Sequence, residues 1–234
     1  MRNKINFEVF IILSEKKITL SVIRKTDSDL IFQKESFFEN NSMGSNFEKL
    51  DFFLDENILK VEKILGSFIE HVNIIINSRD FFNLQISVKK NDYNEKINNH
   101  ILNYLIKDAK YQCEKTIKDM RIIHIVIDKY LIDKNHFLDP PINQKCKNFS
   151  IDISFICLPK EIIEEIEKKL KSYHISINHI LNADYVYKFS NSTNIPIVEM
   201  ASKIIDGHNK NEVKLVNKKQ KNRGFFEKFF NLFS

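Results

Sequence analysis

The fold is decided by residues 121–181, RIIHIVIDKYLIDKNHFLDPPINQKCKNFSIDISFICLPKEIIEEIEKKLKSYHISINHIL. Two runs in it, Arg121 to Ile132 and Asn148 to Cys157, are rich in β-branched and aromatic residues, which predicts two strands. The turn-rich segment DKNHFLDPP joins them. Pro159 then stands where a helix should begin, and EIIEEIEKKLKSY follows with a clear amphipathic period.

The residues before this stretch complete the pattern. A strand at Leu84 to Val88 and a helix near Tyr93 to Thr116 precede the two strands, so the order strand, helix, strand, strand, helix predicts a compact α+β unit. A helix at Asp55 to Val72 and a strand at Val72 to Ile76 are expected before that unit. The N-terminal part is expected to form an antiparallel meander with strands at Phe7 to Leu13, Ile18 to Arg24 and Leu30 to Phe37.

Residues 121–181 resemble the inserted subdomain of the bacterial cell-division protein FtsA. The positions that carry the resemblance are Ile123-His124, Tyr130, Ile132-Asp133, Asp139-Pro140 and Ile175-Ser176-Ile177, with Ile127 where that family usually has proline. The resemblance implies an α+β fold in which a partial actin-like subdomain carries an inserted SHS2-type unit. A C-terminal amphipathic helix on a flexible linker would follow, as the membrane-targeting helix does in that family.

The resemblance also implies a division of the chain. The expected parts are a partial first actin-like subdomain (1–83), the inserted SHS2-type subdomain (84–174), a return to the first subdomain (175–206), a basic flexible linker (207–222) and an amphipathic membrane-targeting helix (223–234). The resemblance implies a truncated or minimal relative, in which the second half of the actin-like fold is expected to be absent. The body, residues 1–206, is expected to bury a core unaided.

The phosphate-binding turns of an actin-like ATPase are also missing. Such turns need glycine, because only glycine lets backbone N–H groups approach the phosphates closely. The first hairpin turn here is LSEKK, Leu13 to Lys17, without Asp or Gly, and no second turn of the DxGGGT kind is present. We therefore expect no cofactor and no enzymatic activity.

The charge of the chain is concentrated at its end. Residues 207–234 contain seven Lys or Arg and two Glu, so they account for the whole formal charge of +5. The first 206 residues are formally neutral, which is unusual for a nucleic-acid-binding domain. We expect no nucleic-acid partner.

The last residues, KKQKNRGFFEKFFNLFS, have the pattern of an interfacial helix. At about 100° per residue the apolar side chains fall within an arc of about 160°. Lysines near anionic lipid and partly buried phenylalanines together give the two signals that stable anchoring needs. The expected membrane-binding residues are Lys218, Lys219, Lys221, Arg223, Phe225, Phe226, Lys228, Phe229, Phe230, Leu232 and Phe233. The alternative is that this helix packs against residues 1–206 or binds a protein partner.

Other candidate sites have simpler structural interpretations. Cys113, Cys146 and Cys157 form no paired motif, so we expect reduced structural thiols. Four side chains could be drawn as a metal cluster, but they lack ligand-pair spacing: His124, Asp128, His136 and Asp139. Asp133 and Asp139 could serve as an acid–base pair in a small hydrolase, yet Asp near a DPP turn more often caps the backbone. We expect no metal site.

The function implied by the resemblance is that of a non-enzymatic, membrane-tethered adaptor in bacterial cell division. No signal peptide and no run of about 18 apolar residues is recognised, so the chain is not expected to span a membrane. The resemblance implies a place at the cytoplasmic face of the inner membrane, at the septum. Expected partners are anionic lipids, division proteins that are FtsZ-associated or late septal, and a second copy of the chain. The predicted partner face comprises Glu161, Glu164, Glu165, Lys168 and Lys169.

The alternative is an adaptor of pilus or envelope assembly. It would resemble PilM and hold a short peptide of an inner-membrane protein through the same inserted unit. The amphipathic tail argues against this alternative, since the PilM family does not usually end in such a helix.

Overall fold

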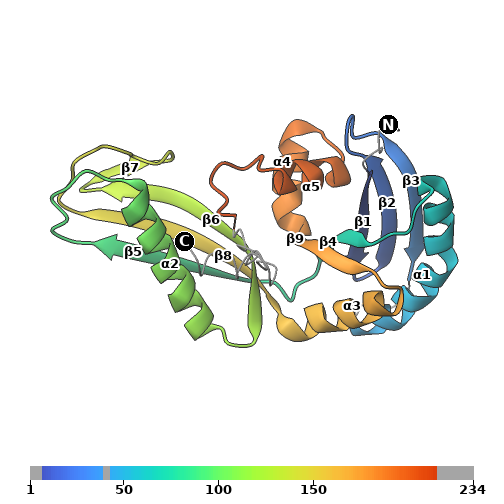
Figure 1. Cartoon of the computed structure of the whole chain (residues 1–234). Helices are drawn as coiled ribbons and strands as arrows, with labels where there is room; N and C mark the ends of the chain where they lie inside the picture. The colour runs from blue at the N-terminus through green and yellow to red at the C-terminus, as the bar shows by residue number, and fades with distance from the viewer. Residues whose placement is uncertain (1–6, 39–42, 215–234) are drawn as a thin grey trace, which may run out of the picture.

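The computed structural model describes residues 7–38 and 43–214 of the chain. These residues form two lobes that lie side by side, each built on its own sheet (Figure 1). The chain leaves the first lobe after strand β4 (His71–Asn77). It returns between strand β8 (Phe149–Pro159) and helix α3 (Lys160–Ser172), so the second lobe is an insertion in the first.

The five-stranded sheet of the first lobe begins as an antiparallel meander of β1 (Phe7–Ser14), β2 (Lys17–Arg24) and β3 (Leu30–Phe37). These strands lie within one residue of the predicted bounds. β4 pairs in parallel with β1, and β9 (Ser176–Asn182) pairs in parallel with β4. The order β3-β2-β1-β4-β9 makes β9 an edge strand.

Helices cover both faces of this sheet. α1 (Met43–Leu65) and α3 pack on one face, and their apolar side chains share a core with Ile11 of β1. α4 (Ala183–Thr193) and α5 (Ile197–Ile205) pack on the other face, around Phe10. Successive residues of a strand point to opposite faces, so β1 contributes to both cores.

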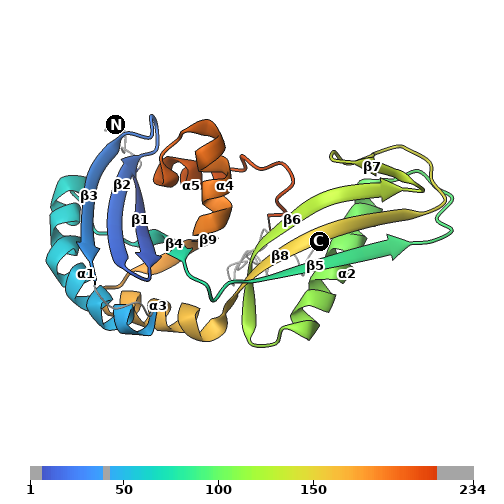
Figure 2. The same ribbon diagram turned by 180° about the vertical axis from the view of Figure 1, so that it is seen from behind.

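The four-stranded sheet of the second lobe has the order β5-β8-β6-β7, with all neighbours antiparallel. Its other strands are β5 (Phe82–Lys90), β6 (Met120–Ile132) and β7 (Asn135–Phe137). One helix, α2 (Asn99–Thr116), covers one face of this sheet. α2 lies in front of the sheet in Figure 1 and behind it in Figure 2.

The α+β fold class predicted from the sequence is confirmed, and a unit of four strands and the helix α2 is inserted in the first lobe. α3, which lies within the predicted range 84–174, packs in the core of the first lobe through Ile163, Ile166 and Leu170. The predicted membrane-targeting helix, 223–234, lies outside the described residues.

Several predicted helix bounds need correction. α2 begins at Asn99 and not near Tyr93, because the Asn98 side chain accepts hydrogen bonds from the N–H groups of His100 and Ile101 at 2.9 and 3.1 Å. α1 begins at Met43, before the predicted start at Asp55. It ends at Leu65, before the predicted Val72, since Gly66 follows with a φ of +66°. In the ranges 7–38 and 43–214, no helix is long and apolar enough to cross a membrane.

Candidate functional site: a groove between the lobes

A groove with a volume of about 710 Å³ lies between the two lobes. One wall is β6 from Arg121 to Ile125, and another is the edge strand β9 from Ile177 to Leu181. The end of α5 and residues 212–214 after it also line the groove. Segments far apart in the sequence thus meet at one concave surface.

Two strand edges border this groove. Within the described part of the chain, β9 pairs with β4 alone, so its other edge carries no strand. β6 pairs with β7 only from Tyr130 to Ile132, and its Ile125 carbonyl accepts a hydrogen bond from the Val213 N–H. From Met120 to His124 the ladder partner of β6 is β8 alone. An unpaired strand edge offers backbone N–H and C=O groups to an incoming extended chain. The groove therefore has the elements that bind a peptide by strand addition.

The groove combines apolar side chains with charges that are already paired. Ile177 and Ile180 of β9 are half-buried and line it. At the rim, Lys25 lies 3.2 Å from Glu8 and 3.1 Å from Asp206, and the hydrogen bond to Asp206 is the main cause that raises the pKa of Lys25. A second rim pair, Arg121 with Glu167 at 3.2 Å, is exposed. The groove therefore presents both apolar side chains and polar groups to a ligand.

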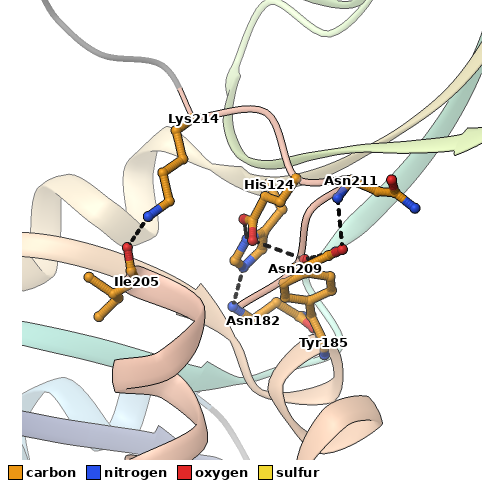
Figure 3. A network of polar contacts seen from close by, with 8 residues as sticks. His124, Asn182, Tyr185, Ile205, Asn209, Asn211 and Lys214 are labelled. Atoms are coloured by element: carbon orange, nitrogen blue, oxygen red, sulfur yellow. Dashed lines mark hydrogen bonds and ion pairs between the residues drawn. The ribbon is translucent and has the colours of Figure 1, made fainter. Parts of the chain in front are cut away.

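A mostly buried polar network forms part of the groove wall (Figure 3). The Asn182 backbone N–H donates to His124 Nε2 at 3.1 Å, so Nε2 is the unprotonated nitrogen and Nδ1–H donates to the Glu212 carboxylate at 2.6 Å. The Tyr185 hydroxyl donates to the other Glu212 oxygen at 2.9 Å and accepts from Asn209 at 2.7 Å. Burial raises the pKa of Tyr185. His124 is 3% exposed, so the hydrogen bonds of this network are largely shielded from water.

Residues Asn209–Lys214, which we call the strap, run from the first lobe to the second. The Ile127 N–H donates to the Asn211 carbonyl at 2.9 Å, and the Val213 N–H donates to the Ile125 carbonyl at 2.8 Å. Glu212 thereby forms an antiparallel bridge opposite Val126. The strap, which belongs to the predicted linker 207–222, therefore has contacts with both lobes. Residues 215–222 lie outside the described residues.

A second cavity, of about 340 Å³, lies beside the turn between β1 and β2. Its charged residues are Lys17, Glu35 and Glu199. Lys17 lies 2.9 Å from Glu35 and, by this hydrogen bond, lowers the pKa of Glu35. Two carboxylates and one lysine that is already paired make a poor environment for a triphosphate.

The predicted partner face is a surface of α3. Its five residues line a shallow hollow of about 660 Å³ together with Asp51 and Tyr173. Lys169 forms an ion pair with Asp51 of α1, and the Tyr173 hydroxyl donates to Asp55 at 2.7 Å. Part of this face thus holds α3 against α1. Binding of a partner by Glu161, Glu164, Glu165 and Lys168 stays a prediction.

The other predicted residues are accounted for as follows. All eleven predicted membrane-binding residues, Lys218 to Phe233, lie outside the described residues. Asp133 accepts a hydrogen bond from the Asn148 N–H at 2.8 Å, which is the expected turn-capping role. Burial raises the pKa of Cys157 to about 12 and also raises that of Cys113, so neither thiol is activated. Among residues 7–38 and 43–214, no group of three or more His, Cys, Asp or Glu side chains is placed to hold a metal.

Sequence reasoning missed the groove and the role of Glu212. The resemblance to FtsA draws attention to His124, but its partners are residue 182, for which no helix or strand is predicted, and residue 212, which falls in the predicted linker. One signal was available, since Glu212 is one of only two acids among the basic last residues 207–234.

Comparisons with known proteins give a likeness of fold over part of the chain. No protein-family model and no curated protein matches this sequence. Among solved structures, the cytoplasmic domain of EpsL, an inner-membrane component of the type II secretion system of Vibrio cholerae, is 13% identical with a TM-score of 0.38. That match covers 77% of this chain and 57% of EpsL.

Two further structures are similar. The PilM–PilN type IV pilus biogenesis complex is 8% identical with a TM-score of 0.47, over 80% of this chain and 50% of that one. A Bacteroides thetaiotaomicron protein of actin-like ATPase fold and unknown function is 13% identical with a TM-score of 0.35. That match covers 80% of this chain and 56% of the Bacteroides protein. The chain therefore spans little more than half of the structures it matches. These similarities are too weak to decide a function, and they do not confirm FtsA in particular.

Proposed function

We propose that this protein is a non-enzymatic adaptor at the cytoplasmic face of the inner membrane that holds a short extended peptide of a membrane protein in the groove between its lobes. This is the PilM-like alternative drawn from the sequence. The observation that carries it is the pair of strand edges, β6 and β9, that border one groove with half-buried isoleucines. Strand addition takes its affinity from backbone hydrogen bonds and its specificity from alternate side chains.

The membrane part of the proposal rests on the sequence of the tail. Residues 218–234 combine basic residues with an apolar arc of phenylalanines, which is the pattern of an interfacial anchor. An adaptor restricted to a surface meets membrane-bound partners at a high effective concentration, so a weak peptide contact suffices.

Envelope assembly is the setting that we put forward. A peptide groove fits it directly, whereas no feature of the described residues is particular to a septal role. Two of the similar proteins are named as parts of a secretion system and a pilus biogenesis complex. Partners of the division apparatus, self-association and a septal location remain expectations from the resemblance to FtsA.

The proposal predicts where a partner cross-links. A photoreactive amino acid placed at Ile177, in the groove, should cross-link in intact cells to a cytoplasmic segment of a membrane protein. The same group placed at Leu138, which is 70% exposed on the second lobe, serves as the control. Mass spectrometry of the adducts identifies the segment.

The second arm of this experiment is Ile180→Arg, combined with the photoreactive group at Ile177. A charged side chain on the apolar part of the groove should reduce the yield of the adduct about tenfold or more. The proposal fails if Ile177 and Leu138 give the same adducts, or if Ile180→Arg leaves the yield unchanged in protein of normal stability.

The absence of nucleotide binding is a separate prediction. Titration of the full chain with ATP and magnesium in a calorimeter should give no binding heat at micromolar concentrations. The reasons are the turn at Ser14 to Lys17, which has no glycine, and the two carboxylates in the cavity beside it. A micromolar dissociation constant would contradict this expectation.

A further inference from the structure

The strap connects the two lobes at a position that also forms part of the groove. It leaves α5 of the first lobe through Gly207, whose φ is +99°, and pairs with β6 of the second lobe. Its residues Glu212, Val213 and Lys214 line the groove. Any movement of the strap therefore changes both the connection between the lobes and the shape of the site.

One side chain of the strap contacts both lobes at once. Glu212 accepts hydrogen bonds from His124 on β6 and from Tyr185 on α4. Its side chain is 12% exposed and that of His124 is 3% exposed, so these bonds are shielded from water. Hydrogen bonds to a charged group in such surroundings are among the stronger polar contacts of a protein.

A second buried connection between the lobes uses the same histidine, because the Asn182 N–H at the end of β9 donates to His124 Nε2 at 3.1 Å. The remaining polar connections are more exposed or leave the chain free to bend. The Arg121–Glu167 ion pair joins β6 to α3, but its side chains are 57% and 48% exposed. The covalent connections are the short segment between β4 and β5 and the junction of β8 with α3. Loop and element ends of this kind are where hinges form.

We infer that the strap is a lock that fixes the angle between the lobes and so sets the width of the groove. While Glu212 is hydrogen-bonded to His124 and Tyr185, the groove keeps the width of the present structure. When the strap leaves β6, the lobes move apart and the β6 edge is uncovered as far as Ile127. The inference rests on the proposed function only in taking the groove as the partner site. The basic tail follows Lys214 directly in the sequence, so a force applied to the tail is transmitted first to the strap.

The lock can be tested without any partner. Spin labels on cysteines introduced at Phe52 of α1 and Leu138 of the second lobe, which are 68% and 70% exposed, report the distance between the lobes in the full chain. The three natural cysteines are buried. Two variants open the lock in different ways: Glu212→Ala removes the anchor, and Val213→Pro removes the N–H that bonds to Ile125.

Both variants should broaden the distribution of distances between the labels about twofold or more, because the lobes sample several angles. Glu212→Gln, which keeps an acceptor for His124, and Lys210→Ala, at an exposed strap residue, should retain the narrow distribution. The inference is overturned if Glu212→Ala and Val213→Pro both keep that distribution in protein that still unfolds cooperatively. Because no partner is present, failure here is distinct from failure of the groove to bind a peptide.

Discussion

Replacing Phe226 by glutamate should release the full chain from vesicles that contain anionic lipid. Phe226 lies in the predicted apolar arc, where a buried phenylalanine contributes up to about 1.5–3 kcal/mol and a charge at membrane depth costs a similar amount. The affinity should therefore fall about 100-fold or more. Phe229→Glu should act alike, and co-sedimentation with vesicles of defined composition measures both.

The matched control is Asn231→Glu, which introduces the same charge on the predicted polar face. It should weaken binding only slightly, by the loss of electrostatic attraction of about 1 kcal/mol per charge. Equal losses in all three variants would contradict an interfacial helix and would favour the alternative that the tail contacts the body.

Truncation after Asp206 should destabilise the protein strongly, whereas truncation after Lys214 should not. The shorter form, residues 1–206, loses the strap and leaves His124 Nδ1–H and the Tyr185 hydroxyl without acceptors. Each buried group left unpaired costs about 1–3 kcal/mol, which lowers the melting temperature by about 5–15 °C in total for a chain of this size. The expectation that residues 1–206 bury a core unaided stays a prediction, and this truncation tests it.

Thermal unfolding of the full chain and the two truncated forms measures this difference. Residues 1–214 keep every described contact and should melt at the temperature of the full chain. If residues 1–206 also melted there, the strap would be a superficial segment and the network around Glu212 would contribute nothing to stability.

The strands were predictable because their signal is local. Alternation of apolar and polar residues and turn residues at the ends placed β1, β2 and β3 within a residue of their bounds. The start of α2 was predicted too early. The apolar residues before Asn98 extend the helical pattern, but the Asn98 side chain caps the helix and so fixes its first residue at Asn99. β7 has only three residues and gives too short a pattern to recognise.

The groove was not predictable because it arises from pairs distant in sequence. β9 lies about a hundred residues after β4 in the sequence, and the whole second lobe lies between these two paired strands. The open edge of β9 is therefore a property of the tertiary fold. The strap was assigned to the linker because Lys and Asn dominate its composition. Its contacts come from backbone hydrogen bonds to β6 and from one acid, Glu212, whose partners His124 and Tyr185 lie far away in the sequence.

The most direct test of the account is a hydrogen-exchange footprint with a synthetic copy of the peptide that the Ile177 cross-link identifies. Addition of this peptide to the full chain should slow amide exchange in β9 from Ile177 to Leu181 and in β6 from Arg121 to Ile125. Exchange on α3 from Glu161 to Lys169 should not change. Protection confined to α3, with both strand edges exchanging as before, would contradict the assignment of the groove as the partner site.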